Sequence, residues 1–186
     1  QLIEEARARG KKQGLEPNIS VANVEDAELG ENKFDVVLAY STFEHVEDWR
    51  RGLENVYRAL KPGGIIYFYS TNRFAFKQSE YQFPLYSWMP DRMRYNFRIA
   101  RQGPDIMKLG IDFNQFSYPQ LRRAFHEIGF SEVMDIMDIF IHRSDPAKMH
   151  NPQAWKKVVL TLVKTFGSLK HPVLTFAPGT MFVCRK

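Results

Sequence analysis

Two stretches decide the fold of this chain: Phe34-Asp-Val-Val-Leu-Ala-Tyr-Ser-Thr-Phe-Glu-His-Val46 and Leu60-Lys-Pro-Gly-Gly-Ile-Ile-Tyr-Phe-Tyr-Ser70. Each contains an apolar run, residues 36–40 and 65–69, of the kind expected for a strand buried on both faces of a parallel sheet. Between Asp48 and Leu60 the apolar positions recur about every 3.6 residues, which predicts a helix. Strand, crossover helix and strand predict parallel neighbours and therefore an α/β fold.

The remaining elements are predicted from local signals. Ser117 is the expected N-cap of a helix whose capping box is completed by Gln120 and which ends at Gly129. Further elements are expected as a helix over residues 2–13, a short strand at 19–24, a strand within 130–141 and a final strand at 180–184.

Composition is that of a cytoplasmic globular protein. The chain has 186 residues, and its longest apolar runs fall far short of the ~18 residues that cross a bilayer. Charged residues occupy its first turns, so no signal-peptide pattern opens it. Cys184 is the single cysteine, which excludes an intrachain disulfide and fits a reducing compartment. The net charge of +5 is mild, but basic residues crowd into two stretches.

Two insertions interrupt the alternation of strands and helices. Residues 73–112 are rich in aromatic, proline and arginine residues and are too long for a plain connection, so a lid over a site is expected. Residues 142–178 contain an amphipathic helix over 152–166, edged with lysines. Such a helix permits peripheral contact with a membrane surface, although packing on its own domain is the more common use.

The ordered motifs resemble those of class I S-adenosylmethionine-dependent methyltransferases of the small-molecule type, similar to the methyltransferases of ubiquinone and menaquinone biosynthesis. They are Asp26-Ala-Glu-Leu, Lys33-Phe-Asp-Val-Val, Phe43-Glu-His-Val, Leu60-Lys-Pro-Gly-Gly, Phe116-Ser-Tyr-Pro-Gln-Leu121 and Glu127-Ile-Gly-Phe130. The resemblance covers residues 1–72 and 113–140 well, the last strand loosely and the insertions hardly at all.

The resemblance implies a Rossmann-like fold: a mostly parallel sheet with helices on both faces, a final antiparallel strand and a helical, aromatic lid. In that plan residues 1–72 form the second half of the methyltransferase core, without its first two strands. The lid follows at 73–112, the core continues at 113–141, a helical insertion occupies 142–178, and the last core strand lies at 179–186. The glycine-rich loop of the family has no counterpart here, so further residues are expected upstream.

The resemblance also implies S-adenosyl-L-methionine as cofactor. Asp26 lies where an acidic side chain accepts from the adenine amino group, and Ala27 where backbone meets the ring. Ala39, Tyr40 and Ser41 fall at the carboxyl end of a strand, the edge at which open α/β sheets bind ligands. For Asp26, the plainer interpretation is an ordinary turn carboxylate.

His45 is the predicted general base for a hydroxyl acceptor, because an imidazole titrates near neutral pH. The alternative is that Glu44 and His45 only pack and hydrogen-bond the loop. A metal site built from Glu44, His45 and Asp48 is not expected. Ser41 stands where some quinone-biosynthesis O-methyltransferases carry an additional glutamate, and magnesium normally takes several oxygen ligands.

The aromatic insertion is the predicted acceptor pocket, because aromatic side chains offer flat apolar surface. The predicted substrate-binding residues are Glu44, Tyr81, Trp88, Arg92 and Tyr95. Arginines 92, 94, 98 and 101 could hold a phosphate or carboxylate of the acceptor. The alternative is a small aromatic core beneath the lid, with the arginines facing water.

The leading functional hypothesis is methylation of a small molecule, at oxygen more than at nitrogen or carbon. A nucleic-acid methyltransferase is the second hypothesis. The Asn/Asp-Pro-Pro-aromatic motif of the amino-directed enzymes is replaced here by Ser41-Thr-Phe-Glu, and no nucleic-acid partner is expected. The third is a catalytically inactive, methyltransferase-like interaction module.

Overall fold

The computed structural model describes residues 2–76, 85–107, 114–143 and 161–186. Within them four strands form one sheet in the order β1-β2-β4-β3. The strands are β1 (Phe34–Tyr40), β2 (Leu60–Thr71), β3 (Glu132–Asp135) and β4 (Gly179–Arg185). The α-helices are α1 (Leu2–Lys12), α2 (Trp49–Ala59), α3 (Asp91–Gln102), α4 (Tyr118–Ile128), α5 (Ile136–Arg143) and α7 (Lys170–Thr175). Short 3-10 turns occur at η1 (Phe43–His45), η2 (Tyr86–Trp88), η3 (Pro104–Met107) and η5 (Gly167–Leu169).

The predicted pair of parallel strands is present. In the β1–β2 ladder Val37 pairs with Ile66 and Ala39 with Phe68. β4 runs antiparallel to both β2 and β3, so β1, β2 and β3 share one direction. This mixed, mostly parallel sheet with an antiparallel last strand confirms the predicted fold class.

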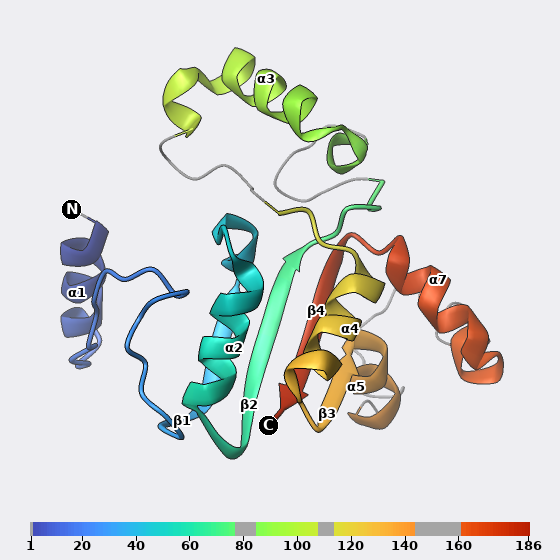
Figure 1. Cartoon of the computed structure of the whole chain (residues 1–186), viewed down its shortest axis with the longest axis horizontal. Helices are drawn as coiled ribbons and strands as arrows, with labels where there is room; N and C mark the ends of the chain where they lie inside the picture. The colour runs from blue at the N-terminus through green and yellow to red at the C-terminus, as the bar shows by residue number, and fades with distance from the viewer. Residues whose placement is uncertain (1, 77–84, 108–113, 144–160) are drawn as a thin grey trace.

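The core lies between one face of the sheet and the helices α2 and α4, which stand side by side in front of the sheet in Figure 1. Leu53 of α2 and Phe125 of α4 are fully buried against Phe68 at the centre of β2. The rings of Phe68 and Phe125 meet edge to face at 5.3 Å. Aromatic pairs in this geometry add about 0.5–1.5 kcal/mol to the burial of their area.

The other face of the sheet keeps large apolar side chains exposed along β1. Val36, Leu38 and Tyr40 are 53%, 75% and 64% exposed. Tyr40 stacks on Tyr69 of β2 at 4.6 Å. Alternation along the strand sends Val37 and Ala39 into the core and their neighbours to the opposite side. The prediction that both faces of this strand are buried was therefore wrong, because one face of β1 is uncovered among the described residues.

Helix α4 begins and ends where its sequence signals predict. Ser117 is the N-cap, its amide donates to Gln120 Oε1 at 3.4 Å, and Gly129 adopts φ 110° at the C-terminus. A left-handed residue after a helix favours glycine because it lacks a Cβ. The predicted helix between the strands likewise forms as α2, with Asp48 Oδ1 accepting from Arg51 N at 3.2 Å.

One strand is longer than predicted and one predicted strand is absent. β2 includes the predicted run 65–69 but begins at Leu60, because Leu60 pairs with Phe34 and the chain then turns through Gly63, whose φ is 78°, before the ladder resumes at Ile65. Residues 19–24 form no strand, and Val21 is 83% exposed. A strand needs a hydrogen-bonded neighbour, and no strand among the described residues pairs with this segment.

The structure describes only the last turn of the predicted 152–166 helix. There Val163 is buried, whereas Leu162 and Phe166 are exposed. The rest of the predicted helix, residues 152–160, lies outside the described residues. No helix in the described part of the chain has the length and apolarity needed to cross a membrane.

Candidate active site

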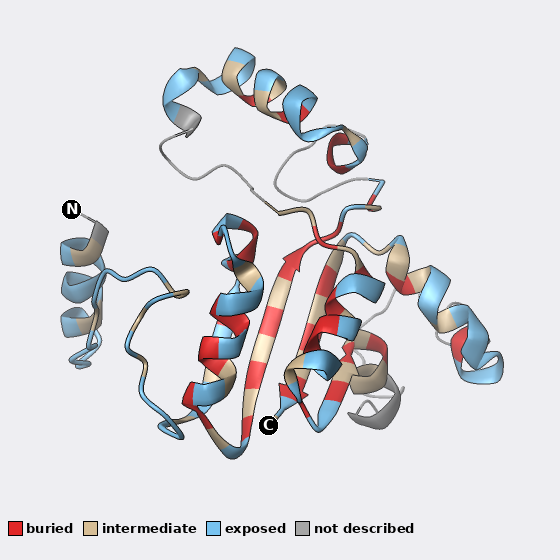
Figure 2. Ribbon diagram, in the orientation of Figure 1, coloured by how far each residue is buried: buried red, intermediate tan, exposed pale blue. Residues whose placement is uncertain are grey.

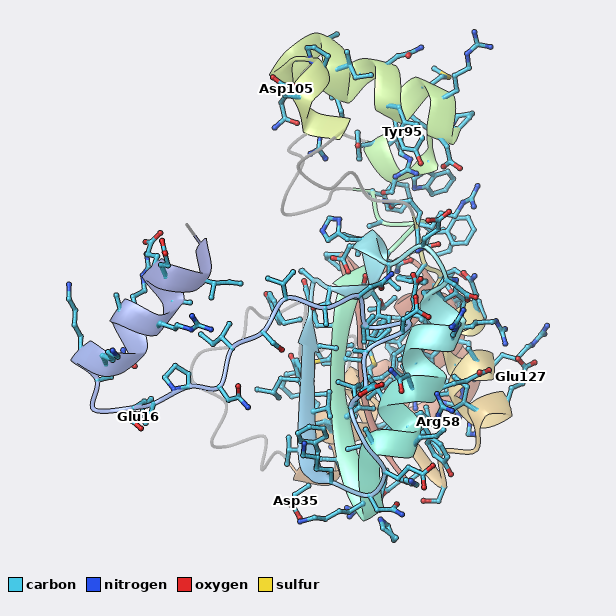
Figure 3. All side chains as sticks on the ribbon, turned by 60° about the vertical axis from the view of Figure 1, so that its left-hand side comes forward. Glu16, Asp35, Arg58, Tyr95, Asp105 and Glu127 are labelled. Carbon is cyan, nitrogen blue, oxygen red and sulfur yellow. The ribbon has the colours of Figure 1, made fainter. Side chains whose placement is uncertain are left out.

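The candidate site lies where β1 and β2 reach their carboxyl ends. Ser41 leaves β1 with φ 47°, and its amide donates to Tyr69 O at 2.9 Å. Ala39 is buried beneath this turn, while Tyr40 faces outward. Figure 3 labels Asp35 near the amino end of β1 and Tyr95 on α3 at opposite ends of the molecule. The lid therefore lies beyond the carboxyl ends of the strands.

A tight turn at residues 23–27 holds the predicted adenine-binding residues. The amides of Asp26 and Ala27 both donate to Asn23 O, at 3.1 and 2.8 Å. Asn55 of α2 donates its Nδ2 to Val24 O at 2.9 Å and to Ala27 O at 2.8 Å. Because Asn55 is nearly buried, these bonds tie the turn to α2.

The Asp26 carboxylate forms an ion pair with Arg51. Both side chains are more than half exposed. Exposed ion pairs contribute only about 0–1 kcal/mol, so Asp26 could exchange Arg51 for another partner at little cost.

A hollow of 380 Å³ separates this turn from the loop that follows β1. Its volume is within the range of about 300–1,000 Å³ found for small-molecule sites. The exposed side chain of His45 lies on its wall. The lining residues are Ala22, Asn23, Val24, Glu25, Thr42, His45, Val46 and Glu47. The structure thus brings His45 to the same hollow as the turn that carries Asp26.

Glu44 lies beneath the loop and is fully buried. Its Oε2 accepts from Ser70 Oγ of β2 at 2.9 Å, and its backbone oxygen accepts from Asn114 N at 3.0 Å. Asn114 Nδ2 also donates to Val46 O at 2.6 Å. These bonds fix the position of His45 from two sides. Sequence reasoning missed Ser70 and Asn114, although a serine at the carboxyl end of a buried parallel strand was a usable signal.

Four aromatic rings gather beyond the end of β2: Phe74, Phe76, Trp88 and Phe176. Phe76, Trp88 and Phe176 have centroids 5.7–6.3 Å apart and planes within 22–32° of one another. All three are more than 40% exposed. We call these four residues the aromatic cluster. It includes the predicted substrate residue Trp88, whereas Tyr81 lies outside the described residues.

Hydrogen bonds hold the aromatic cluster in place. The indole Nε1 of Trp88 donates to Ala75 O at 3.2 Å. Asn72, buried just after β2, donates its Nδ2 to the carbonyls of Leu174, Thr175 and Ala177 at 2.9–3.2 Å. This clamp joins the start of the lid to the segment that carries Phe176, two regions about a hundred residues apart in the chain.

The lid helix α3 places the remaining predicted substrate residues in different environments. Arg92 is exposed and Tyr95 is half-buried. Between them Arg94 is 1% exposed, and its guanidinium lies 5.6 Å from the Tyr95 ring. In Figure 2 short buried stretches interrupt the otherwise exposed or half-buried surface of α3. The buried member of the arginine group is therefore Arg94, with Arg98 a turn later, rather than Arg92.

In the described part of the chain no three His, Cys, Asp or Glu side chains come together as they would around a metal ion. Cys184 is buried in β4, and burial raises the pKa of its thiol above the usual value. A protonated, covered thiol is a poor nucleophile, so Cys184 serves packing.

Part of the chain is similar in sequence to known methyltransferases. Residues 1–68 match the methyltransferase domain model. The chain is 26% identical over 141 residues to the ubiquinone biosynthesis O-methyltransferase of Coxiella burnetii, covering 76% of this chain and 54% of that protein. It is 33% identical over 148 residues to the demethylmenaquinone methyltransferase of Bacteroides fragilis, covering 71% and 55%. These similarities support a class I S-adenosylmethionine-dependent methyltransferase.

Solved structures agree on the fold. A S-adenosylmethionine-dependent methyltransferase from Mesorhizobium loti superimposes with a TM-score of 0.53 at 16% identity, over 98% of this chain and 76% of that one. A S-adenosylmethionine-dependent methyltransferase from Thermotoga maritima gives 0.51 at 16% identity, over 98% and 70%. The chain spans about half the length of the curated relatives that it matches.

Proposed function

We propose that this methyltransferase domain serves the transfer of a methyl group from S-adenosylmethionine to a hydroxyl oxygen of a small aromatic, glycan or lipid-like acceptor. The observation that carries the proposal is the hollow between the turn at 23–25 and the loop that holds His45. It lies at the carboxyl end of a parallel strand, where open α/β sheets bind their ligands.

Residues next in the chain to those that line the hollow would hold one side of a nucleoside. Asp26 accepts from the adenine amino group after release of its exposed partner Arg51, and Ala27 contributes backbone beside the ring. The turn at Tyr40 and Ser41, above the buried Ala39, faces the amino-acid part of the cofactor. S-adenosylmethionine, when bound, supplies an electrophilic methyl group on its sulfonium.

His45 acts as the general base that removes the proton of the acceptor hydroxyl. Its side chain is exposed on the wall of the hollow, and the Glu44–Ser70 and Asn114 bonds hold its loop. Proton removal by a positioned base contributes typically about 10²–10⁴-fold to rate. In-line displacement also depends on alignment, which a fixed loop provides.

The aromatic cluster provides the apolar surface for the acceptor. Phe76, Trp88 and Phe176 are exposed yet held by hydrogen bonds, which limits the entropy lost when a flat ligand binds. Relatives named for ubiquinone biosynthesis and for demethylmenaquinone support an aromatic acceptor.

Calorimetric titration with S-adenosylmethionine tests the cofactor part of the proposal. Asp26→Ala should weaken binding about tenfold, the loss of one hydrogen bond to a charged group. Asp35→Ala is the matched control, because Asp35 is an exposed carboxylate at the other end of the sheet, paired with Lys61 at 2.8 Å. Equal affinity in both variants would remove Asp26 from the site.

Transfer of a labelled methyl group to a catechol tests the catalytic part. We expect His45→Ala to lower kcat about 10²–10⁴-fold while affinity for S-adenosylmethionine changes little. His126→Ala, which alters an exposed histidine of α4, should leave kcat unchanged. Full activity in His45→Ala would assign that loop a packing role.

A further inference from the structure

Arg94 is a buried cation whose donors are only partly used. Its side chain is 1% exposed, and its Nη2 contacts Asp91 Oδ1 at 2.7 Å. Among the described residues, no acceptor lies within hydrogen-bond distance of Nε or Nη1. Asp91 itself is 67% exposed, so the single counter-charge sits at the surface. The Nε–H and both Nη1–H groups are therefore buried without a hydrogen-bond acceptor among the described residues.

An open buried guanidinium is expensive to maintain. Removing a charge from water costs several kcal/mol, and only full pairing and hydrogen bonding offset that cost. The second buried arginine, Arg98, follows one helical turn later and is 6% exposed. Side chains four residues apart lie on the same face of a helix. Arg98 is engaged by Gln102, whose Oε1 accepts from its Nε at 2.5 Å, so the argument rests on Arg94.

We propose that Arg94 binds an acidic group of the methyl acceptor, a carboxylate or a phosphate, at the lid. This inference rests on the proposed function for the identity of the acceptor. The guanidinium plane matches the two oxygens of a carboxylate or phosphate, and its free nitrogens supply the donors that such a group needs. Arg92, which the sequence favoured, is exposed and lacks this enclosure.

The lid position suits the role. In Figure 1 α3 lies beyond the carboxyl end of β2. The aromatic cluster includes Phe74 and Phe76, which follow that end of β2 in the chain. An acceptor that carries an acidic group at one end of a flat apolar body could then contact the cluster with that body. The acceptor class is accordingly an aromatic or lipid-like hydroxyl compound that is also an acid or a phosphate ester.

Nitrogen-15 NMR of the arginine Nε–H region tests the proposal on the complete chain. The Arg94 Nε–H signal is assigned in the unaltered chain by scalar-coupling correlations to the backbone of the same residue. Inorganic phosphate and benzoate are titrated separately, which distinguishes a phosphate from a ring-borne carboxylate. We expect one of them to shift the Arg94 signal to saturation, and Arg94→Gln to bind that anion about 10- to 100-fold more weakly.

Arg92→Gln removes the same charge from the exposed side of the helix and is the matched control. It should bind the anion as the unaltered chain does. An unmoved Arg94 signal with both anions, or an equal loss in the two variants, would overturn the proposal. Since the NMR signal comes from the unaltered chain, the test holds even if Arg94→Gln unfolds.

The proposed function fails separately from this inference. If no methyl transfer is detected but Arg94 still binds the anion, Arg94 is an anion-binding residue of a different activity. If the rate of methyl transfer changes neither in Arg94→Gln nor when the acceptor lacks an acidic group, the proposed function stands and the Arg94 anion site is rejected.

Discussion

Asp135 of the core and Arg94 of the lid are both buried charges, but only Asp135 is fully satisfied. Asp135 is 0% exposed. Its Oδ2 accepts from Tyr118 Oη and Lys170 Nζ, each at 2.8 Å, and its Oδ1 accepts from the amides of Met137 and Asp138 at 2.9 and 3.0 Å. For Arg94, the acceptor found among the described residues is the exposed Asp91, and its Nε and Nη1 have none.

The difference in hydrogen bonding indicates different roles: the Asp135 charge stabilises the fold, whereas the Arg94 charge is available to bind a ligand. The Asp135 bonds join β3, α4, α5 and α7, and burial beside the Asp135 carboxylate raises the pKa of Tyr118, which therefore stays protonated as a donor. Every oxygen of Asp135 is used within the fold. The Nε and Nη1 donors of Arg94 remain unpaired among the described residues. The free energy cost of removing a charge from water is thus offset by hydrogen bonds at Asp135 in the core, but only partly at Arg94 in the lid.

Removing the Asp135 carboxylate should have the largest effect. Asp135→Ala leaves Lys170, whose side chain is 17% exposed, without its most buried partner and takes the cap from the start of α5. We expect the free energy of unfolding to fall by about 3–5 kcal/mol, measured by urea denaturation. The control Glu132→Gln, in an exposed pair with Arg185, should lose less than about 1 kcal/mol. A loss of less than about 1 kcal/mol in Asp135→Ala would contradict the stabilising role assigned to the Asp135 hydrogen bonds.

Replacing Arg94 with an apolar residue should increase the free energy of unfolding, the opposite of the effect of Asp135→Ala. Arg94→Met keeps the length of the side chain and removes an incompletely paired buried charge. We expect the free energy of unfolding to rise by about 1–2 kcal/mol. Arg92→Met, at an exposed position, should stay within about 0.5 kcal/mol of the unaltered chain. Marked destabilisation of Arg94→Met would mean that Arg94 is as completely paired as Asp135.

The smallest expected effect is a loss of folding stability at low pH, caused by protonation of Asp138 next to Asp135. Burial alone raises the pKa of Asp138, but hydrogen bonds from Lys170 and from the Asp135 amide outweigh it and lower the pKa below its usual value. A lowered folded-state pKa gives stability above the unfolded value, near 3.9, that is lost as the pH falls through the folded-state pKa.

Urea unfolding between pH 7 and pH 3 should therefore show a decline that begins below about pH 4. Asp138→Asn should flatten part of that decline and cost less than about 1 kcal/mol at pH 7, because Asp138 is partly exposed. Glu127→Gln, which alters a half-exposed pair with Arg50, should keep the full decline. An unchanged decline in Asp138→Asn would remove Asp138 from the acid-sensitive network.

The sequence by itself determined the elements whose signals are local. Alternating or continuous apolar runs specified β1 and most of β2, and capping residues specified the limits of α4, because both depend on neighbours within a few positions. The segment at 19–24 was mispredicted because strand formation depends on a distant partner as well as on propensity.

The candidate site divides in the same way. His45, Asp26 and Ser41 were named from ordered motifs. His45 lines the hollow, whereas Asp26 and Ser41 follow and precede the lining residues Glu25 and Thr42 in the chain. Only the tertiary structure showed that Glu44 is buried against Ser70, that Asn72 clamps the Phe176 segment, and that Arg94 rather than Arg92 is enclosed. Burial and hydrogen bonding join residues far apart in the chain, so composition and spacing cannot rank four arginines on one helix, whereas packing can.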